Sequence, residues 1–298
     1  DNLAIDRWTN AGGDIEFRIY TGGVLNKINT MTVGNDAQAT SFINGTVGRD
    51  LKVKNTTKDA TVGRDAYAAS IDHSTIGRNA YADVITASTV GGSTNPGSGI
   101  PEPAKEPFPV TETMLLDWRV GGESGGIING NYEINANQTL GPKKINGNLS
   151  ISEGVIVTLS GTVYVTGNID VDNGVTLKLS SDYGNTSGVM LADGTIHAGE
   201  NDIFQGSGQS GSYFMIVSSA SGGGHHDSAI DVHKSADGIV FAAPYGKIYL
   251  HQNVAAKQVT GFSIHVENNG IITYETGLQS AAFSSGPGGG WQIEPGTW

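Results

Sequence analysis

The sequence predicts an all-β protein built as a parallel β-helix (β-solenoid), with right-handed winding expected and one short helix near residues 111–119. A first set of short repeats begins at Thr32, Thr46, Thr61, Thr75 and Thr89, so the repeats are 14–15 residues long. A short, fixed period is typical of a solenoid in which each copy stacks on its neighbour. Paired-helix repeats need roughly 33 to 45 residues, so this shorter spacing excludes them. The alternative is a set of antiparallel hairpins with similar turns.

The residue pattern within each copy is that of β-structure. In one copy, Thr75 and Ile76 precede a glycine, Gly77, and alternation of small apolar residues follows through Ala80 and Ala82. Glycine after β-branched residues suits a corner at which two backbones approach closely. Residues 1–92 are therefore expected to form an N-terminal β-solenoid, entered by a strand over the alternating segment DIEFRIY, residues 14–20.

Residues 93–125 are expected to form a linker followed by a bracing helix. The segment GGSTNPGSGIPEPAKEPFP is rich in proline and glycine, which favours an extended loop. Thr111 is a plausible N-cap, Glu112 suits the first turn, and Gly121-Gly122 is expected to end the helix. The apolar side of this helix is expected to cap or brace the solenoid through Met114, Leu115 and Trp118.

Residues 126–298 are expected to form a second parallel β-helix with coils of about 20 residues, a length at the short end of solenoid repeats. The segment 147–151 returns at 167–171, the segment 154–160 returns at 174–180, and a looser copy spans 261–277. Such coils place short strands on three faces and stack the inward aliphatic side chains. The expected turn residues are Asn148, Asn168, Asn173, Asn268 and Asn269, because asparagine tolerates left-handed backbone and bonds to local backbone.

Several segments of this second region resemble a known family. QTLGPKKINGNLSIS, GTVYVTGNI, SGVMLADGTI, FQGSGQSGSYFMIVSS, IVFAAPYGKIYL and FSSGPGGGW are similar to the C-terminal region of PilX-like bacterial pilus-assembly, or minor pilin-like, proteins. The resemblance covers about residues 100–293 and implies an extracellular β-rich region of a surface appendage. The membrane-anchored pilin helix of that family does not occur in this chain. The TVGRDA copies at about 30–92 also resemble bactofilin-like repeats in texture.

Composition limits the partners that the chain is expected to bind. The formal net charge is -12 and the isoelectric point is about 4.9, and no basic stripe is present, so we expect no nucleic-acid partner. Cysteine is absent, which excludes disulfides and thiolate chemistry. No stretch reaches 18 apolar residues, so no membrane span is expected in this chain, and its start shows no signal peptide. Because Asp1 has no preceding Met, the chain is interpreted as a trimmed form or a fragment.

One histidine-rich loop is the candidate metal site. The segment SGGGHHDSAIDVH holds His225, His226, Asp227, Asp231 and His233, and imidazole with carboxylate is a common ligand set for zinc. Its spacing matches no strong motif, and a solvated polar loop is the favoured interpretation. If a metal binds, we expect His226 and His233 to lie on one side with Asp231. No cofactor is expected to be required, and weak calcium or zinc binding stays open.

A catalytic interpretation finds little support in the residue pattern. Asp170 and Asp172 lie on one strand, but the preceding coil has Ser150 and Ser152 at the equivalent positions, so acids do not stack on acids. The C-terminal β-helix contains no arginine for a lyase-type elimination. GSGQSG, residues 206–211, lacks the Gly-x-Ser-x-Gly spacing and is expected to be a turn.

Four tyrosines are the candidate surface contacts. Tyr67 and Tyr81 occupy matching places in successive copies and should stack. Together with Tyr245 and Tyr249, they could present flat rings to sugars. The alternative is that the rings fill the core or cover an edge.

These observations predict a non-enzymatic, extracellular structural component of a bacterial surface appendage. We expect the protein either to associate with a pilus or to form a filament itself, and an adhesive role is one version of this prediction. The expected partners are other pilin or appendage subunits, a second copy of the chain, and surface glycans. The alternative function is a carbohydrate-active β-helix enzyme, either a polysaccharide lyase or a hydrolase.

Overall fold

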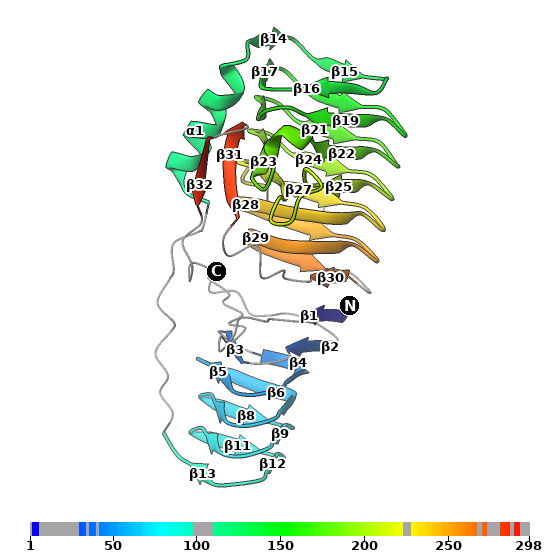
Figure 1. Ribbon diagram of the computed structural model, residues 1–298. Helices are drawn as coiled ribbons and strands as arrows, with labels where there is room; N and C mark the ends of the chain where they lie inside the picture. Colours follow the sequence, from blue (N-terminus) through cyan, green and yellow to red (C-terminus); the bar gives the residue numbers. More distant parts are fainter. Residues whose placement is uncertain are drawn as a thin grey trace. The chain divides into compact units, whose positions relative to one another are not determined.

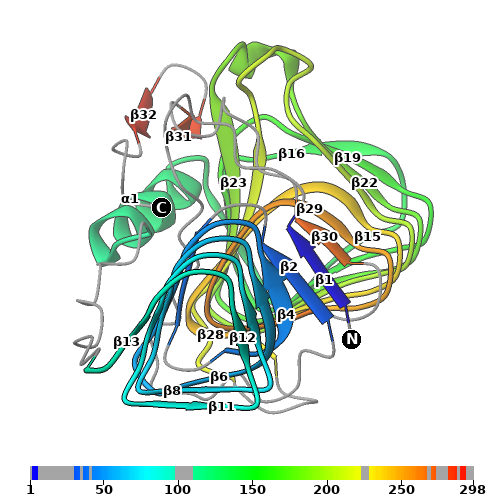
Figure 2. The same cartoon turned by 90° about the horizontal axis from the view of Figure 1, so that it is seen from below.

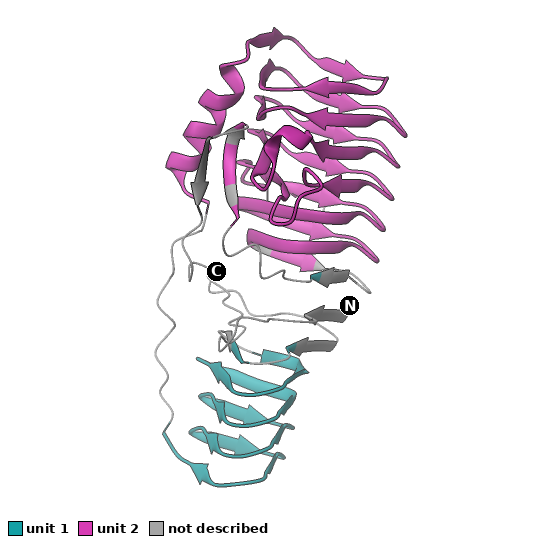
Figure 3. Cartoon of the chain, in the orientation of Figure 1, with its two compact units in different colours: residues 1–106, 267–273 teal, residues 107–266, 274–298 magenta. Residues whose placement is uncertain are grey.

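The chain is a parallel β-helix protein made of two compact units. A computed structural model describes residues 2–5, 30–33, 36–39, 42–97, 110–222, 228–266, 270–272, 281–286 and 289–292. Unit 1 comprises residues 1–106 and 267–273, and unit 2 comprises residues 107–266 and 274–298 (Figure 3). The predicted entry strand over residues 14–20 and the predicted turn residues Asn268 and Asn269 lie outside the described residues.

Unit 1 consists of short parallel strands that wind in stacked coils (Figure 1). Its strands are β1 (Asn2–Ile5), β2 (Thr30–Val33), β3 (Ala37–Ala39), β4 (Phe42–Val47), β5 (Leu51–Val53), β6 (Thr56–Val62), β7 (Ala66–Tyr67), β8 (Ser70–Asp72), β9 (Thr75–Ile76), β10 (Ala80–Tyr81), β11 (Val84–Thr86), β12 (Thr89–Val90), β13 (Thr94–Asn95) and β30 (Gly270–Ile272).

The repeat period of the sequence is the coil period of unit 1. Thr46 pairs with Thr61, Thr61 with Thr75, and Thr75 with Thr89, in each case in parallel. Successive coils therefore superpose when the unit is seen along its stack (Figure 2). The residue after each of these threonines points inward, and the side chains of Val62 and Ile76 are almost fully buried. The predicted stacking of the copies is confirmed, and the hairpin alternative is excluded for this segment.

The glycine of each copy allows the coils to approach closely at one corner. The N–H of Gly63 donates to the carbonyl of Val47, and that of Gly77 donates to the carbonyl of Val62, both at 2.8 Å. A Cβ added to Gly77 would overlap the carbonyl oxygen of Gly63 and lie 2.8 Å from its carbonyl carbon. Glycine is required here by backbone proximity, as the sequence indicated.

The described part of unit 2 contains one α-helix and a larger stack of parallel strands (Figure 1). Its elements are α1 (Glu112–Glu123), β14 (Ile127–Asn129), β15 (Tyr132–Ile134), β16 (Gln138–Leu140), β17 (Lys143–Asn146), β18 (Leu149–Ile151), β19 (Ile156–Leu159), β20 (Val163–Val165), β21 (Ile169–Val171), β22 (Thr176–Leu179), a 3-10 turn (Ser181–Tyr183), β23 (Ser187–Ala192), β24 (Ile196–Ala198), β25 (Ile203–Gln205), β26 (Phe214–Ser218), β27 (Ile230–Val232), β28 (Asp237–Leu250), β29 (Ala255–Val266), β31 (Ala282–Gly286) and β32 (Gly289–Gln292).

The first coils of unit 2 follow the repeat that the sequence predicts, and the later ones do not. Leu149 pairs with Ile169, and Val157 pairs with Leu177, which is the register of the two repeated sequence segments. The next pairing joins Val171 to Ala198, and the one after joins Ala198 to Val232, so each of these coils is longer than the one before it. The extra residues lie between the paired strands, and the inward-facing residues of those strands stay paired in register from coil to coil.

The C-terminal segment departs from the predicted coil. β31 pairs in parallel with β23, through Ser187 and Phe283, and forms an antiparallel pair with β32. Strand β31 packs beside α1 (Figure 1). The prediction that the coils continue to residue 298 is therefore wrong for residues 282–286 and 289–292.

The predicted turn asparagines act between coils. Asn148 Oδ1 accepts from the N–H of Asn168 at 2.9 Å, and Asn168 Oδ1 accepts from the N–H of Thr195 at the same distance. Asn173 Oδ1 accepts from the N–H of Glu200 at 2.7 Å. These residues have the predicted structural role, but they fulfil it by bonding the next coil, since none of the three has a positive φ.

Helix α1 braces the outer side of the coil stack. Its Thr111 N-cap accepts from the N–H of Met114, as predicted. Trp118 and Leu115 are fully buried in a cluster with outward residues of β23 and β26, such as Leu191 and Met215. All six residues of β23 are buried, because one face lines the interior of the coil and the other faces this cluster. The helix thus covers a side of the stack.

The predicted helix end at Gly121-Gly122 is wrong. The helix continues to Glu123 and its C-cap is Ser124, which donates its N–H to the carbonyl of Val120. Gly122 is buried, and a Cβ at this position would lie 2.8 Å from the Cβ of Tyr164. This glycine serves the close approach of the helix to β20, a role that the sequence does not distinguish from a helix stop.

Candidate functional site

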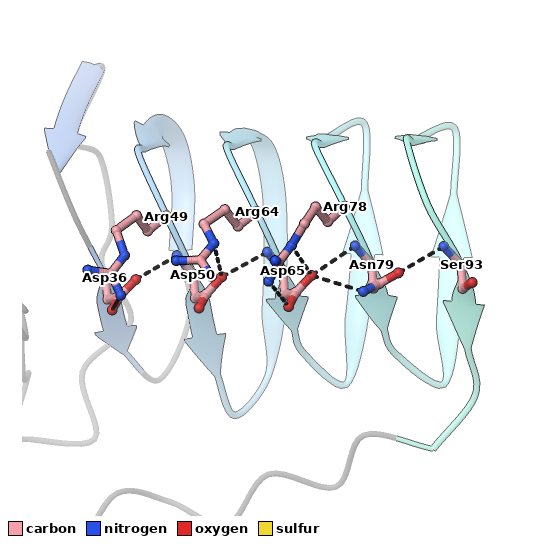
Figure 4. Close-up of polar contacts among 8 residues, drawn as sticks. All are labelled: Asp36, Arg49, Asp50, Arg64, Asp65, Arg78, Asn79 and Ser93. Carbon is pink, nitrogen blue, oxygen red and sulfur yellow. Dashed lines mark hydrogen bonds and ion pairs between the residues drawn. The ribbon is translucent and has the colours of Figure 1, made fainter.

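A row of acidic and amide side chains joins successive coils of unit 1 (Figure 4). Oδ1 of each Asp or Asn accepts from the backbone N–H of the equivalent residue in the following coil, at 2.8 to 3.1 Å. The row consists of Asp36, Asp50, Asp65, Asn79 and Ser93, and Ser93 is its last donor. We call these five residues the carboxylate ladder.

Arginines of the same repeat pair with the carboxylate ladder. Arg49 lies 3.3 Å from Asp36, Arg64 lies 3.8 Å from Asp50, and Arg78 lies 2.6 Å from Asp65. Hydrogen bonds from Arg78 are the main reason that the pKa of Asp65 is lowered from its ordinary value. These contacts explain the Arg-Asp dipeptide of the TVGRDA motif. Its arginine forms an ion pair with the aspartate of the preceding coil, and its aspartate accepts a hydrogen bond from a backbone N–H of the following coil.

Tyr67 and Tyr81 stack, as predicted. Their ring centroids are 4.4 Å apart and their planes differ by 4°. Both rings are half-buried. The pair lies on adjacent strands, β7 and β10, which hold the two residues in register.

One outward sheet face of unit 2 carries a row of histidine, aspartate and tyrosine side chains. Equivalent positions on β21, β24, β27, β28 and β29 are paired in parallel. They hold Asp170, His197, Asp231, Tyr249 and His265 in that order. The first four of these positions each lie between two buried aliphatic residues, so the core fixes the outward direction of their side chains.

Two further histidines lie beside this row, directly after β27 and β28. The N–H of His233 donates to the carbonyl of Ala198 at 2.8 Å, and the N–H of His251 donates to that of Val232 at 2.9 Å. The ring of His233 lies 4.5 Å from that of His197 and 4.6 Å from that of His251, centroid to centroid. The ring of His251 also contacts Tyr249 at 4.4 Å.

Asp231, His233 and His251 bring their polar atoms together. Nε2 of His251 lies 2.9 Å from Oδ1 of Asp231, and Nε2 of His233 lies 3.9 Å from Oδ2. The nearest ligand atoms of all three lie within 4.8 Å of one another. Burial, followed by the charge of His197, lowers the pKa of His233, which favours its neutral form. We call these three residues the Asp-His cluster.

The Asp-His cluster differs in one member from the predicted site. Asp231 and His233 lie side by side as expected, whereas His225, His226 and Asp227 lie outside the described residues. His251 was missed because it belongs to the next coil. The signal that could have found it is the recurring pattern Ile-x-aliphatic-x, which gives Ile230-Asp231-Val232-His233 and Ile248-Tyr249-Leu250-His251.

The two remaining candidate tyrosines have different surroundings. Tyr245 is 40% exposed, and its hydroxyl donates to Glu112 at the start of α1. Burial of that hydroxyl, and the bond to Glu112, raise the pKa of Tyr245 to about 12. Tyr249 is only 2% exposed, so the prediction of a surface contact there is wrong. Its ring stacks on His265, and Nζ of Lys247 lies 4.8 Å from the ring centroid.

An open groove of about 990 Å³ lies on another side of unit 2. The segment 206–211 forms part of its wall as a turn in which Gly208 and Gly211 have positive φ, as the sequence predicted. Of the described residues that line the groove, Asp237 is the one carboxylate. Acid–base hydrolysis of a glycosidic bond uses two carboxyl groups, and the groove supplies a single one.

Asp202 is a buried acid in the same unit. It is 1% exposed, its Oδ1 accepts from the N–H of Val175 at 2.9 Å, and Oδ2 has no hydrogen-bond partner among the described residues. Burial raises its pKa from 3.8 to about 6, against the smaller lowering effects of the backbone hydrogen bonds from Val175 and Gly199. The folded chain therefore binds this proton more tightly than the unfolded chain does.

Replacing Asp202 with asparagine is expected to stabilise the protein at pH 8. Since the pKa is raised on folding, the aspartate destabilises the folded state above pH 6, and this cost disappears as the pH falls toward 4. The variant should gain about 1–2 kcal/mol at pH 8 and less at pH 4. Urea unfolding at both pH values measures this. The exposed Asp83→Asn variant is the control, and an equal gain at both pH values would contradict the explanation.

Neither the helix of this chain nor the comparison with known proteins identifies a function, so a functional proposal depends on the fold and on the contacts described above. Within the part of the chain that the structure describes, no helix has the length and hydrophobicity needed to span a membrane. A search of protein-family models, of curated proteins and of solved structures finds no match to this chain.

Proposed function

We propose that this protein is a non-enzymatic, extracellular structural component of a bacterial surface appendage, either associated with a pilus or forming a filament. The supporting observation is that cohesion within each unit is directed along the stack of coils. Parallel backbone pairing, the carboxylate ladder and the inter-coil asparagines all join one coil to the next. A part that transmits force along an appendage needs such lengthwise cohesion.

The expected partners are other appendage subunits or a second copy of the chain. In the described part of unit 1, the strands of the last coil, β11, β12 and β13, each pair on one side. An unpaired strand edge is a template for the addition of another strand. Val84 of β11 is 55% exposed at this edge, which adds apolar surface for a contact.

Surface glycans are the second expected class of ligand. The stacked rings of Tyr67 and Tyr81 form a paired aromatic surface on unit 1. An adhesive role predicts that a glycan panel binds the chain and that the Tyr67→Ala/Tyr81→Ala variant loses this binding. Release of new reducing ends or unsaturated products from any polysaccharide would instead support the carbohydrate-active alternative.

The proposal is tested on intact cells and with the purified chain. Antibodies raised against the chain should label appendages on unpermeabilised bacteria that encode it, and deletion of its gene should alter or remove those appendages. Light scattering and electron microscopy of the purified chain over a range of concentrations then distinguish a filament-forming subunit from an associated one. Labelling confined to permeabilised cells would overturn the proposal.

A further inference from the structure

We propose that Asp231, His233 and His251 form a binding site for a divalent transition-metal ion, for which Zn²⁺ is the probe. This inference is independent of the structural role proposed above, because it concerns one face of unit 2 alone. Two imidazoles and one carboxylate are a ligand set that zinc accepts, with bond lengths of about 2.0–2.2 Å.

The spacing of the ligand atoms fits one bound ion. In a tetrahedral site with such bonds, neighbouring ligand atoms are about 3.3 Å apart. Oδ1 of Asp231 lies 2.9 Å from Nε2 of His251, Oδ2 lies 3.9 Å from Nε2 of His233, and one ligand atom from each of the three residues lies within 4.8 Å of the other two. Binding of one ion by all three groups would therefore require side-chain rotations that bring these ligand atoms closer together.

The fold holds these three groups in place before an ion arrives. Asp231 lies between Ile230 and Val232, which are fully buried, so its backbone belongs to the core of the coil. Backbone bonds to the preceding coil fix both histidines. The ring of His197 contacts that of His233, and the ring of Tyr249 contacts that of His251. These contacts limit the rotation of the two ligand rings.

The cluster is also accessible to an ion from solvent. The side chains of Asp231, His233 and His251 are 34%, 36% and 27% exposed. Three ligands leave the fourth tetrahedral position for water or for a donor group of another molecule. A fully enclosed structural zinc site would instead use four protein ligands, so we infer an open site.

A matched pair elsewhere in the chain provides a control for the experiment. Nδ1 of His73 lies 2.8 Å from Oδ1 of Asp72 in unit 1, which reproduces one histidine–aspartate contact without a second histidine nearby among the described residues. His197, which contacts Oδ1 of Asp170 at 3.0 Å and the ring of His233, packs on a proposed ligand, so His197→Ala is expected to weaken zinc binding less than removal of a ligand does.

Isothermal titration of the full chain with Zn²⁺, after treatment with a chelator, tests the site. We expect one equivalent to bind at the Asp-His cluster. Loss of an outer contact typically weakens metal binding by about 10–100-fold, so loss of a ligand in His251→Ala or Asp231→Asn should weaken it by about 100-fold or more. His73→Ala should change the affinity less than about twofold. Cobalt substitution supplies a second readout, since a tetrahedral Co²⁺ site absorbs visible light and the ligand variants should lose that band.

Several results would overturn the assignment. The absence of zinc binding by the unmodified chain would mean that the cluster is a hydrogen-bonded contact between coils and holds no metal. Zinc binding that survives His233→Ala and His251→Ala unchanged would place the ion elsewhere. If a variant shows altered circular dichroism without metal, the conservative His251→Gln variant takes its place, and retention of full affinity there would count against the site.

Discussion

Replacing Trp118 with alanine is expected to destabilise unit 2 by about 3–5 kcal/mol. Trp118 is fully buried between α1 and the outward side of β23, where it contacts a cluster that includes Leu191 and Met215. Removal of a large buried aromatic side chain loses its transfer free energy and leaves a cavity, and the cost of the two is of this size. Urea unfolding followed by circular dichroism measures the effect.

Leu116 gives a matched control on the same helix. Its side chain is 55% exposed and is absent from the buried cluster, so Leu116→Ala should cost less than about 0.5 kcal/mol. The comparison separates helix propensity from packing. A similar small effect for Trp118→Ala would contradict the conclusion that α1 is a brace packed on the side of the coils.

Replacing Gly77 with alanine is expected to be one of the most damaging small changes in unit 1. The added Cβ would overlap the carbonyl oxygen of Gly63, a backbone atom that cannot rotate away. Overpacking in a core typically costs about 1–3 kcal/mol. Because the clash here is with the backbone of the preceding coil, the loss of stability should reach or exceed the upper end of this range. Hydrogen exchange of the Gly77 N–H, which donates to Val62, should accelerate together with that of its neighbours.

A control for this change lies in the same coil. Thr75 is exposed on β9, just before the corner that Gly77 forms, so Thr75→Ala removes a side chain without touching the corner. It should cost less than about 1 kcal/mol. If Gly77→Ala were tolerated as well as Thr75→Ala, the close approach of the coils at this corner would be wrong.

The parts of the fold that the sequence predicted are those with a repeated local pattern. The regular threonine spacing is the coil length of unit 1, because each coil must place the same residue at the same corner. The repeated segments 147–151 and 167–171 likewise identified the pairing of β18 with β21. Thr111 was identified as an N-cap because capping depends on adjacent residues.

The parts that the sequence did not reveal depend on contacts between distant segments. Gly122 has the sequence signature of a helix stop, and its close approach to Tyr164, which leaves no room for a Cβ, gives a different reason for a glycine at this position. The coil that joins Ala198 to Val232 has an insertion, so a fixed period fails there. His251 joins the Asp-His cluster because the next coil brings it alongside. The role of the TVGRDA aspartates was missed for the same reason, since their partners lie one coil away.

The most direct test of the account concerns the in-register parallel stacking of the coils. Thr61 and Thr75 are exposed partners on adjacent coils, and the chain contains no cysteine. Adjacent strands lie about 4.8 Å apart, within the range of a disulfide, whereas residues two coils apart are about 10 Å apart and beyond it. Under mild oxidation, Thr61→Cys/Thr75→Cys should therefore form an intramolecular disulfide, and Thr61→Cys/Thr89→Cys should stay reduced. Equal oxidation of both variants, or oxidation of the second alone, would contradict the stacked-coil structure.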